Sequence, residues 1–201
     1  MRWHPATCLL AVVFCLPTAA RAGDDYAAML AFLTHSRIDG QALSGAQGSI
    51  KVNQAAGDLN TQLNAHALAS GQVAQADVHA TAVSHDNRID ANAPMHARAE
   101  LAGGALANAS GLASVNQASG QGNGQVNAVG VVAAEQPIPM QAPAPAAQRL
   151  PGRPAAALGQ RHAVVAADAL RGFAGVLQLN QIAGSSNVVE NRLGLHVQTG
   201  P

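Results

Sequence analysis

Hydrophobic and polar residues alternate in three separate stretches of the chain. Ile50 and Val52 alternate with Lys51 and Asn53, and the same alternation returns at 113–116 and 177–180. A period of two is typical of a β-strand with one buried face. Each stretch is followed by a short break, where a glycine permits positive φ at little cost, and then by a second segment. The breaks begin at Gly57, Gly120 and Gly184. The pattern predicts three strand–turn–strand units with half-buried strands.

These units are copies of one repeat. They span Gly48–Leu68, Gly111–Val131 and Gly175–Leu195, align over 21 columns without a gap, and start 63 and 64 residues apart. An Ala-Leu pair precedes each copy at the same offset, at 42–43, 105–106 and 169–170. Six columns are identical in all copies: Gly48, Asn53, Gln54, Gly57, Asn60 and Asn64, then Gly111, Asn116, Gln117, Gly120, Asn123 and Asn127, then Gly175, Asn180, Gln181, Gly184, Asn187 and Asn191. The predicted fold class is an all-β repeat of three arch-like or solenoid-like rungs joined by long disordered linkers, largely disordered as a free monomer.

The identical positions are the candidate self-assembly residues. One isolated arch is marginal in water, so the copies are expected to stack on one another or on other chains. In-register stacking places Asn over Asn and Gln over Gln about 4.8 Å apart, and their amides then form ladders of hydrogen bonds. No charge in the repeats recurs in all three copies, and those present are expected to act as gatekeepers: Lys51, Asp58, Glu190 and Arg192. The second copy has no charged residue and is expected to be the most assembly-prone.

The other segments are expected to be a leader, linkers and a tail. Residues 1–22 combine Arg2, an apolar run over 7–16 and small residues before a cleavage point between Ala22 and Gly23, which predicts a secretory signal peptide. Within the N-terminal segment 23–47, Asp24–His35 has the spacing of a short amphipathic helix. Linkers 69–110 and 132–174 separate the repeats, and 196–201 is a tail. The second linker is rich in proline, which cannot donate to a ladder, so it is expected to lie outside the stack.

Composition narrows the class of protein. Both cysteines, Cys8 and Cys15, lie in the predicted signal, so disulfides and thiol chemistry are not expected in the mature chain. Nine basic and eleven acidic residues remain after cleavage, a net charge of about −2. That balance argues against a polycationic binder of nucleic acid. Alanine dominates the apolar residues, so the core is expected to be thin.

Candidate sites for chemistry are weak. His79, His85 and His96 share the first linker without metal-ligand spacing, and the Asp86–Asp90 segment lacks the bidentate glutamate of a calcium loop. The glycines of 120–124 lie inside a repeat and do not have phosphate-loop spacing. Asn108 matches a glycosylation pattern that is common by chance. We expect no catalytic residue, no metal, no cofactor and no small-molecule substrate.

The signal, three Gly-x-x-x-[Val/Leu]-Asn-Gln-x-[Ala/Ser]-Gly-x-x-Asn-x-x-x-Asn repeats and the long linkers together resemble the Fap-type functional amyloid proteins of bacterial biofilms. The resemblance covers the signal and the three repeats, and the linkers match in kind only. It implies subunits that cross the periplasm unfolded, leave through an outer-membrane pore and polymerise into cross-β fibrils. Fibril subunits of that family carry a cysteine motif near the C-terminus, whereas this chain ends ENRLGLHVQTGP.

The expected function is that of a secreted structural component of an extracellular functional amyloid fibril that supports biofilm formation and adhesion. Its expected partners are itself, homologous fibril subunits and an outer-membrane export pore, with no nucleic acid. Two alternatives stay open. One is a periplasmic, chaperone-like accessory protein that binds fibril subunits and controls their assembly. The other is a monomeric three-rung β-solenoid that acts as an adhesin.

Overall fold

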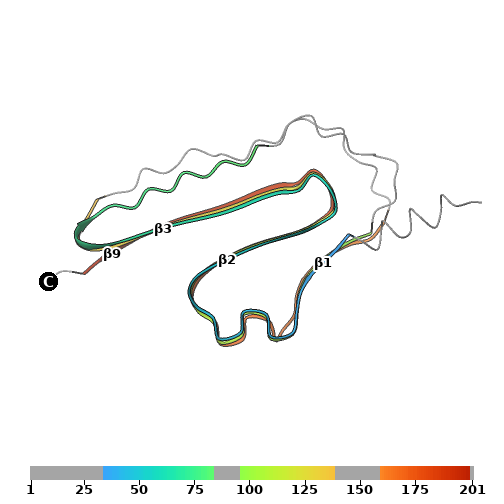
Figure 1. The fold of residues 1–201 in the computed structure, drawn as a ribbon, viewed down its shortest axis with the longest axis horizontal. Helices are drawn as coiled ribbons and strands as arrows, with labels where there is room; N and C mark the ends of the chain where they lie inside the picture. Colours follow the sequence, from blue (N-terminus) through green and yellow to red (C-terminus); the bar gives the residue numbers. More distant parts are fainter. Residues whose placement is uncertain (1–33, 84–95, 139–158, 200–201) are drawn as a thin grey trace, which may run out of the picture.

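The computed structural model describes residues 34–83, 96–138 and 159–199, which form a stack of three similar rungs (Figure 1). Rung 1 contains β1 (His35–Ile38), β2 (Gln47–Ala56) and β3 (Thr61–Ala74). Rung 2 contains β4 (Ala97–Leu101), β5 (Ser110–Ser119) and β6 (Gly124–Pro137). Rung 3 contains β7 (Arg161–Val165), β8 (Ala174–Ala183) and β9 (Val188–Gln198). Seen down the stack in Figure 1, the three rungs follow nearly the same path.

Equivalent strands pair in parallel and build three sheets of three strands. The sheet orders are β1-β4-β7, β2-β5-β8 and β3-β6-β9. Pairing is in register with the sequence repeat, since Asn53 lies opposite Asn116 and Asn116 lies opposite Asn180. The predicted all-β fold of three repeated rungs is therefore confirmed. No helix in the described ranges is long and apolar enough to cross a membrane.

Each rung is longer than the 21 columns found in the sequence. β3 and its equivalents continue past the predicted repeats, to Ala74, Pro137 and Gln198. A short strand also precedes each long strand and is joined to it by an arc of turns, at 39–46, 102–109 and 166–173. Residues 69–74, 97–110, 132–137 and 161–174 of the predicted linkers therefore belong to the rungs. The short strands have the sequences HSRI, ARAEL and RHAVV; burial alternates along the first two but not along the third, and no column is identical in all three. Residue identity therefore did not reveal them.

Several predictions fall on segments outside the described residues. These include the signal peptide with its Ala22–Gly23 cleavage point, residues 24–33 of the predicted helix, and linker residues 84–95 and 139–158. Thr34 lies in a turn and His35 begins β1, so the predicted helix does not extend to His35. The predicted disorder of the free monomer stays a prediction.

The arc between the short strand and the next long strand explains the Ala-Leu pair. Leu43, Leu106 and Leu170 have φ values of 58°, 58° and 65°, in the left-handed region. A branched residue there is strained by about 1–3 kcal/mol. Leu106 is nonetheless only 1% exposed and packs in the core with Leu101 and Val115. Its packing offsets the strain, which accounts for leucine at a position where backbone conformation alone favours glycine.

Apolar packing covers two faces of the stack. One cluster fills the space between the short strands with their arcs and one face of the β2-β5-β8 sheet. On the far side, the extended segment 75–83 runs along the outer face of the β3-β6-β9 sheet (Figure 1). Its inward residues alternate with exposed ones and are Ala76, Val78, Ala80 and Ala82. Parallel sheets are stable when both faces are covered, and this segment supplies the outer cover.

Candidate self-assembly site

All eighteen identical repeat positions lie in the described residues and stack column by column. The Gly48, Asn53 and Gln54 columns lie on the β2-β5-β8 sheet, and the Asn64 column lies on the β3-β6-β9 sheet. The Gly57 and Asn60 columns form the turn that joins these sheets. The six columns therefore lie in three places: two sheets and the turn between them.

The Asn53 and Asn64 columns face each other between the two long sheets and form one network. Asn116 Nδ2 lies 3.0 Å from Asn53 Oδ1 and 2.9 Å from Asn64 Oδ1. Asn180 Nδ2 makes the same pair of contacts one rung further on, at 3.0 Å to Asn116 Oδ1 and to Asn127 Oδ1. Each amide thus bonds along the stack and across it. This is the ladder geometry predicted from sequence, with cross-links between two ladders added.

The polar face of the long strands is a core face, not a solvent face. Asn116 and Asn127 are 0% exposed, and their Nδ2 atoms also donate to backbone carbonyls of the opposite sheet at 3.0 and 3.2 Å. Buried amides are stable only when hydrogen-bonded, and here every rung supplies the partners of the next. The predicted half-buried strand is therefore wrong for rung 2, where both faces are buried. Its central place also accounts for the absence of charge in the second copy.

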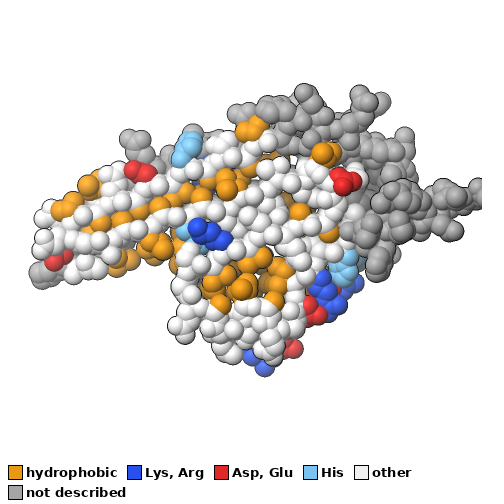
Figure 2. Space-filling view, viewed as in Figure 1, with side chains coloured by type: hydrophobic (Ala, Val, Ile, Leu, Met, Phe, Trp, Pro, Cys, Tyr) orange, Lys and Arg blue, Asp and Glu red, His pale blue; other side chains and the backbone are white. Residues whose placement is uncertain are grey.

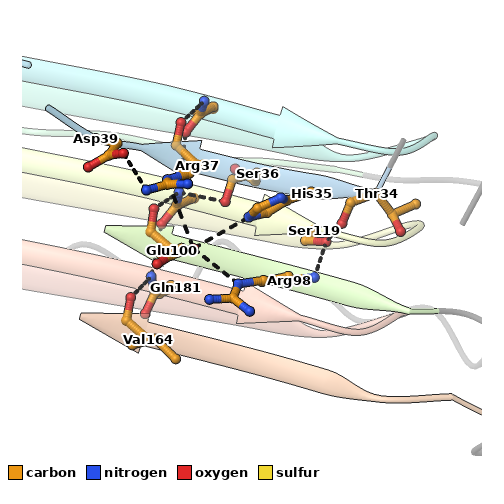
Figure 3. Close-up of polar contacts among 12 residues, drawn as sticks. Thr34, His35, Ser36, Arg37, Asp39, Arg98, Glu100, Ser119, Val164 and Gln181 are labelled. Carbon is orange, nitrogen blue, oxygen red and sulfur yellow. Dashed lines mark hydrogen bonds and ion pairs between the residues drawn. The ribbon is translucent and has the colours of Figure 1, made fainter. Parts of the chain in front are cut away.

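The Gln54 column holds the short strands against the long ones (Figure 3). Gln54 Nε2 donates to Arg37 O at 2.8 Å, Gln117 Nε2 to Glu100 O at 2.9 Å, and Gln181 Nε2 to Val164 O at 2.9 Å. Along the stack, Gln117 Nε2 lies 3.2 Å from Gln54 Oε1. This column therefore joins the rungs and also fixes the short sheet to the long one.

The turn depends on glycine and asparagine together. Asn60 Nδ2 donates to Gly120 O at 2.8 Å, one rung ahead, and Asn123 Nδ2 donates to Gly184 O at the same distance. A Cβ on Gly57 would lie 2.3 Å from Gly120 O. Only glycine allows two turns to approach this closely. The asparagine then satisfies the carbonyl that the approach exposes.

Glycine is required again where the long strand begins. A Cβ on Gly111 would lie 2.4 Å from Gly48 O, and a Cβ on Gly175 would lie 2.1 Å from Gly111 O. These contacts point from each rung toward the preceding one. The Gly48 position has nothing within 4 Å in this direction, because rung 1 ends the stack.

One buried column of glutamines is not among the six identical columns of the repeat. Gln125 is 0% exposed, and its Nε2 donates to Gln117 O at 3.0 Å and to Asn180 O at 3.1 Å. Gln62 occupies the same column in rung 1, but Val189 replaces it in rung 3. Because only two copies carry glutamine, a test for identity in all three excluded the column.

Charged residues of the short sheet neutralise one another. Arg37 and Glu100 are neighbours in one column, and Glu100 also accepts from Arg98 Nε at 3.0 Å (Figure 3). His35 Nε2 lies 3.5 Å from the same carboxylate. The hydrogen bond from Arg98, followed by the charges of Arg98 and Arg37, lowers the pKa of Glu100. Stacked opposite charges therefore take the place of amides at this edge.

The predicted gatekeepers differ in their surroundings. Glu190 and Arg192 form an ion pair with each other on β9, and Arg192 Nη2 also lies 3.4 Å from Ala80 O of the covering segment. Asp58 is exposed in the turn. Lys51 lies at the free face of rung 1, opposite His66, on the side of β2 that carries the Asn53 column.

The histidines considered as metal ligands form no site in the described part of the chain. His79 and His96 are exposed there, and no group of three or more His, Cys, Asp or Glu residues comes together among the described residues. His85 and the Asp86–Asp90 segment lie outside them. Gly120 and Gly122 lie in the turn between β5 and β6.

Comparison with known proteins agrees with the stacked repeat. The family model of the functional amyloid protein FapB/FapC family matches residues 18–198. The chain belongs to this family. As a member it is a component of a secreted, extracellular functional amyloid of biofilms. No solved structure matches the chain.

Proposed function

We propose that the chain is a structural fibril component that grows by stacking rung 3 of one copy on rung 1 of the next. The observation that supports this most is the register of the columns. Six residues recur at the same place in all three rungs, and the stack ends on β1, β2 and β3 at one face and on β7, β8 and β9 at the other. When rung 3 of one copy stacks on rung 1 of another, each of these six columns continues across the junction.

The unpaired edges are long enough to act as templates. β2 and β3 have 10 and 14 residues, and β8 and β9 have 10 and 11. A long parallel edge presents a row of N–H and C=O groups, which favours pairing with another chain. No strand of the described ranges pairs with these edges.

The two faces differ, which favours head-to-tail contact. Side-chain donors of the asparagine ladder point toward rung 1, as in Asn180 to Asn116 and Asn116 to Asn53. The two end rungs also differ in exposure: Asn53 of rung 1 is exposed, whereas Asn180 of rung 3 is only 2% exposed. The rung 1 face thus offers amide donors, and the rung 3 face offers acceptors. A head-to-tail contact of this kind does not close and produces a filament.

Charges at such a junction do not repel within a column. Glu190 would meet the column position of Leu63, Arg192 that of Ala65, and Val164 that of Arg37. Export through an outer-membrane pore, which the resemblance implies, is compatible with a mature chain that has no cysteine, because no disulfide closes a loop. The role is structural, and the proposal contains no catalytic step.

Lys51 supports a second candidate function, that of an accessory protein controlling assembly. A charge in an inner column makes the rung 1 face a poorer docking surface for the next rung, so a copy added to a growing fibril through rung 3 would obstruct the next addition. Such a protein lengthens the lag of a polymerising homologous subunit when added in small amounts. A fibril component shortens it.

Fibril formation by the mature chain, Gly23–Pro201, tests the proposal. At neutral pH we expect thioflavin-positive fibrils with reflections at about 4.7 Å and about 10 Å. Adding the chain at substoichiometric amounts to a polymerising subunit separates the two candidates by the direction of the change in lag. A chain that stays monomeric for days, with strong amide-exchange protection in all rungs, would instead favour the monomeric adhesin.

A further inference from the structure

The chain has a single lysine, and it lies in a column that is otherwise buried. Lys51 is exposed at the free face of rung 1. Its column continues as Ser114 and Gln178, which are 0% and 7% exposed. Figure 2 shows one basic patch beside a small histidine patch in the middle of the visible end face, while the other charges lie near its rim. Any rung placed on this face therefore covers Lys51.

His66 faces Lys51 across the arch and adds to its effect. Its Nδ1 lies 2.8 Å from Ser49 Oγ, and its Nε2 lies 2.7 Å from Ser114 Oγ. Burial, and then the charge of Lys51, lowers the pKa of His66. The histidine is therefore neutral near pH 7, and a proton on it would place a second positive charge beside Lys51.

No carboxylate on the surrounding strands compensates these groups. Within the described elements packed around His66, β2 carries only Lys51, β5 carries no charge, and β6 carries only Glu135 near its far end. β3 has no acidic residue. Asp58 lies beyond the end of β2, in the turn. Within the strands that the structure describes around this face, no carboxylate balances its positive charge.

We propose that the rung 1 face selects a homologous rung that carries a carboxylate in the Lys51 column. The inference rests on the head-to-tail stacking proposed above. The chain's own rung 3 offers neutral Gln178 at this place, so self-stacking buries Lys51 without a counter-charge. A buried, unpaired charge is strongly unfavourable, whereas a carboxylate one strand spacing away, about 4.8 Å, forms an ion pair. The preferred partner is therefore a related repeat with Asp or Glu here, and self-addition is slow.

Seeded elongation of the mature chain tests this with two variants and two controls. Gln178→Glu supplies the carboxylate and should elongate wild-type seeds about five- to tenfold faster, the size of one good ion pair. Lys51→Gln removes the charge, leaves rung 3 untouched and should also accelerate elongation. Gln198→Glu adds the same negative charge at an exposed end of β9, and Arg171→Gln removes an exposed cation outside the inner columns. Both controls should match wild type. On seeds made from the double variant Gln178→Glu/Lys51→Gln, the carboxylate should give no gain over Lys51→Gln alone, because no lysine faces it.

Acidification provides an independent readout. The pKa of His66 in the folded chain lies below its unfolded value of about 6.5. The unfolded chain therefore binds the proton more readily, and stability contributed by this face is lost as pH falls through that range. Wild-type elongation should slow between pH 7.5 and 5.5. Gln178→Glu should slow less, because its carboxylate favours the protonated histidine.

The outcomes separate this inference from the proposed function. Fibrils that grow equally fast from wild type, Gln178→Glu and Lys51→Gln would overturn the inference and leave head-to-tail stacking intact. A wild type that stays soluble while either variant forms fibrils would support the inference. If all three stay soluble, the inference and the proposed function both fail.

Discussion

Fibrils of a Gly48→Ala variant are expected to stop growing, although the single chain still folds. In the chain, a Cβ at Gly111 or Gly175 would lie within 2.4 Å of a backbone oxygen of the preceding rung. Gly48 has the same role in its column but no rung before it, so its Cβ would meet nothing within 4 Å. Stacking another copy supplies the missing rung, and the Cβ then collides with the backbone of Gly175. A collision with backbone is not relieved by a side-chain rotation, so we expect elongation to fall by about a hundredfold or more.

Matched variants separate this collision from backbone strain. Gly48 has φ 93°, so alanine there is strained by about 1–3 kcal/mol in the single chain too. Gly45→Ala carries a similar strain, since φ is 69°, but Asn108 in the same column shows that a side chain is tolerated. Gly45→Ala should therefore elongate nearly as wild type. Gly111→Ala should disrupt the stack within the chain itself. Equal elongation by Gly48→Ala and Gly45→Ala would mean that no rung is added on the rung 1 face.

The second large effect is expected at Asn116. Its side chain donates to Asn53, Leu63 and Asn64 and accepts from Asn127 and Asn180. Alanine would leave several buried polar groups without a hydrogen-bond partner. Each group that finds no other partner destabilises the fold by about 1–3 kcal/mol. We expect Asn116→Ala to lower the free energy of unfolding by about 3–5 kcal/mol, measured by urea denaturation of the soluble chain.

Asn53→Ala is the control in the same column. Because Asn53 is exposed at the end of the stack, the substitution should lower the free energy of unfolding of the soluble chain by only about 0.5–1.5 kcal/mol, the size of an ordinary hydrogen bond. In fibrils, rung 1 becomes an internal rung, and the two variants should then lower the denaturant midpoint for dissolution by similar amounts. A difference that persists unchanged in fibrils would show that Asn53 stays at a free end.

The sequence predicted the parts of the fold that depend on residue identity. The three copies, their register and the turn at Gly57 follow from six invariant columns, because stacking places identical side chains on one another. The same columns supply the candidate assembly residues, whose role in assembly stays a prediction. Reasoning from polarity alone misplaced the asparagines, since an amide is costly in a core unless a neighbouring rung supplies its partner, and strand alternation does not show that partner.

Elements whose residues differ between the three copies could not be predicted from residue identity. The short strand and arc are built from residues that differ between copies, and only the Ala-Leu pair recurs there. Leu106 lies at positive φ, where local preference favours glycine, so its presence is explained by the core cluster in which it packs. The Gln125 column and the effect of Lys51 on the pKa of His66 each require knowledge of which strand faces which.

The central claim is that copies join head to tail with the columns in register, and disulfide trapping tests it most directly. Gln47 and Ala174 are both exposed and occupy one column, two rungs apart in the same chain. Within a chain that distance is about 9.6 Å, beyond the reach of a disulfide, whereas across the proposed junction it is about 4.8 Å. The mature chain has no cysteine of its own, since Cys8 and Cys15 lie in the predicted signal.

Fibrils grown from an equal mixture of Gln47→Cys and Ala174→Cys chains should, on oxidation, give disulfide-linked heterodimers. Fibrils of either variant alone should give none. Mass spectrometry of the cross-linked peptides identifies which cysteines are joined, and a soluble mixture serves as the control. The account predicts Cys–Cys bonds between positions 47 and 174 only. Bonds between two copies of position 47, or well-formed fibrils without any cross-link, would contradict it.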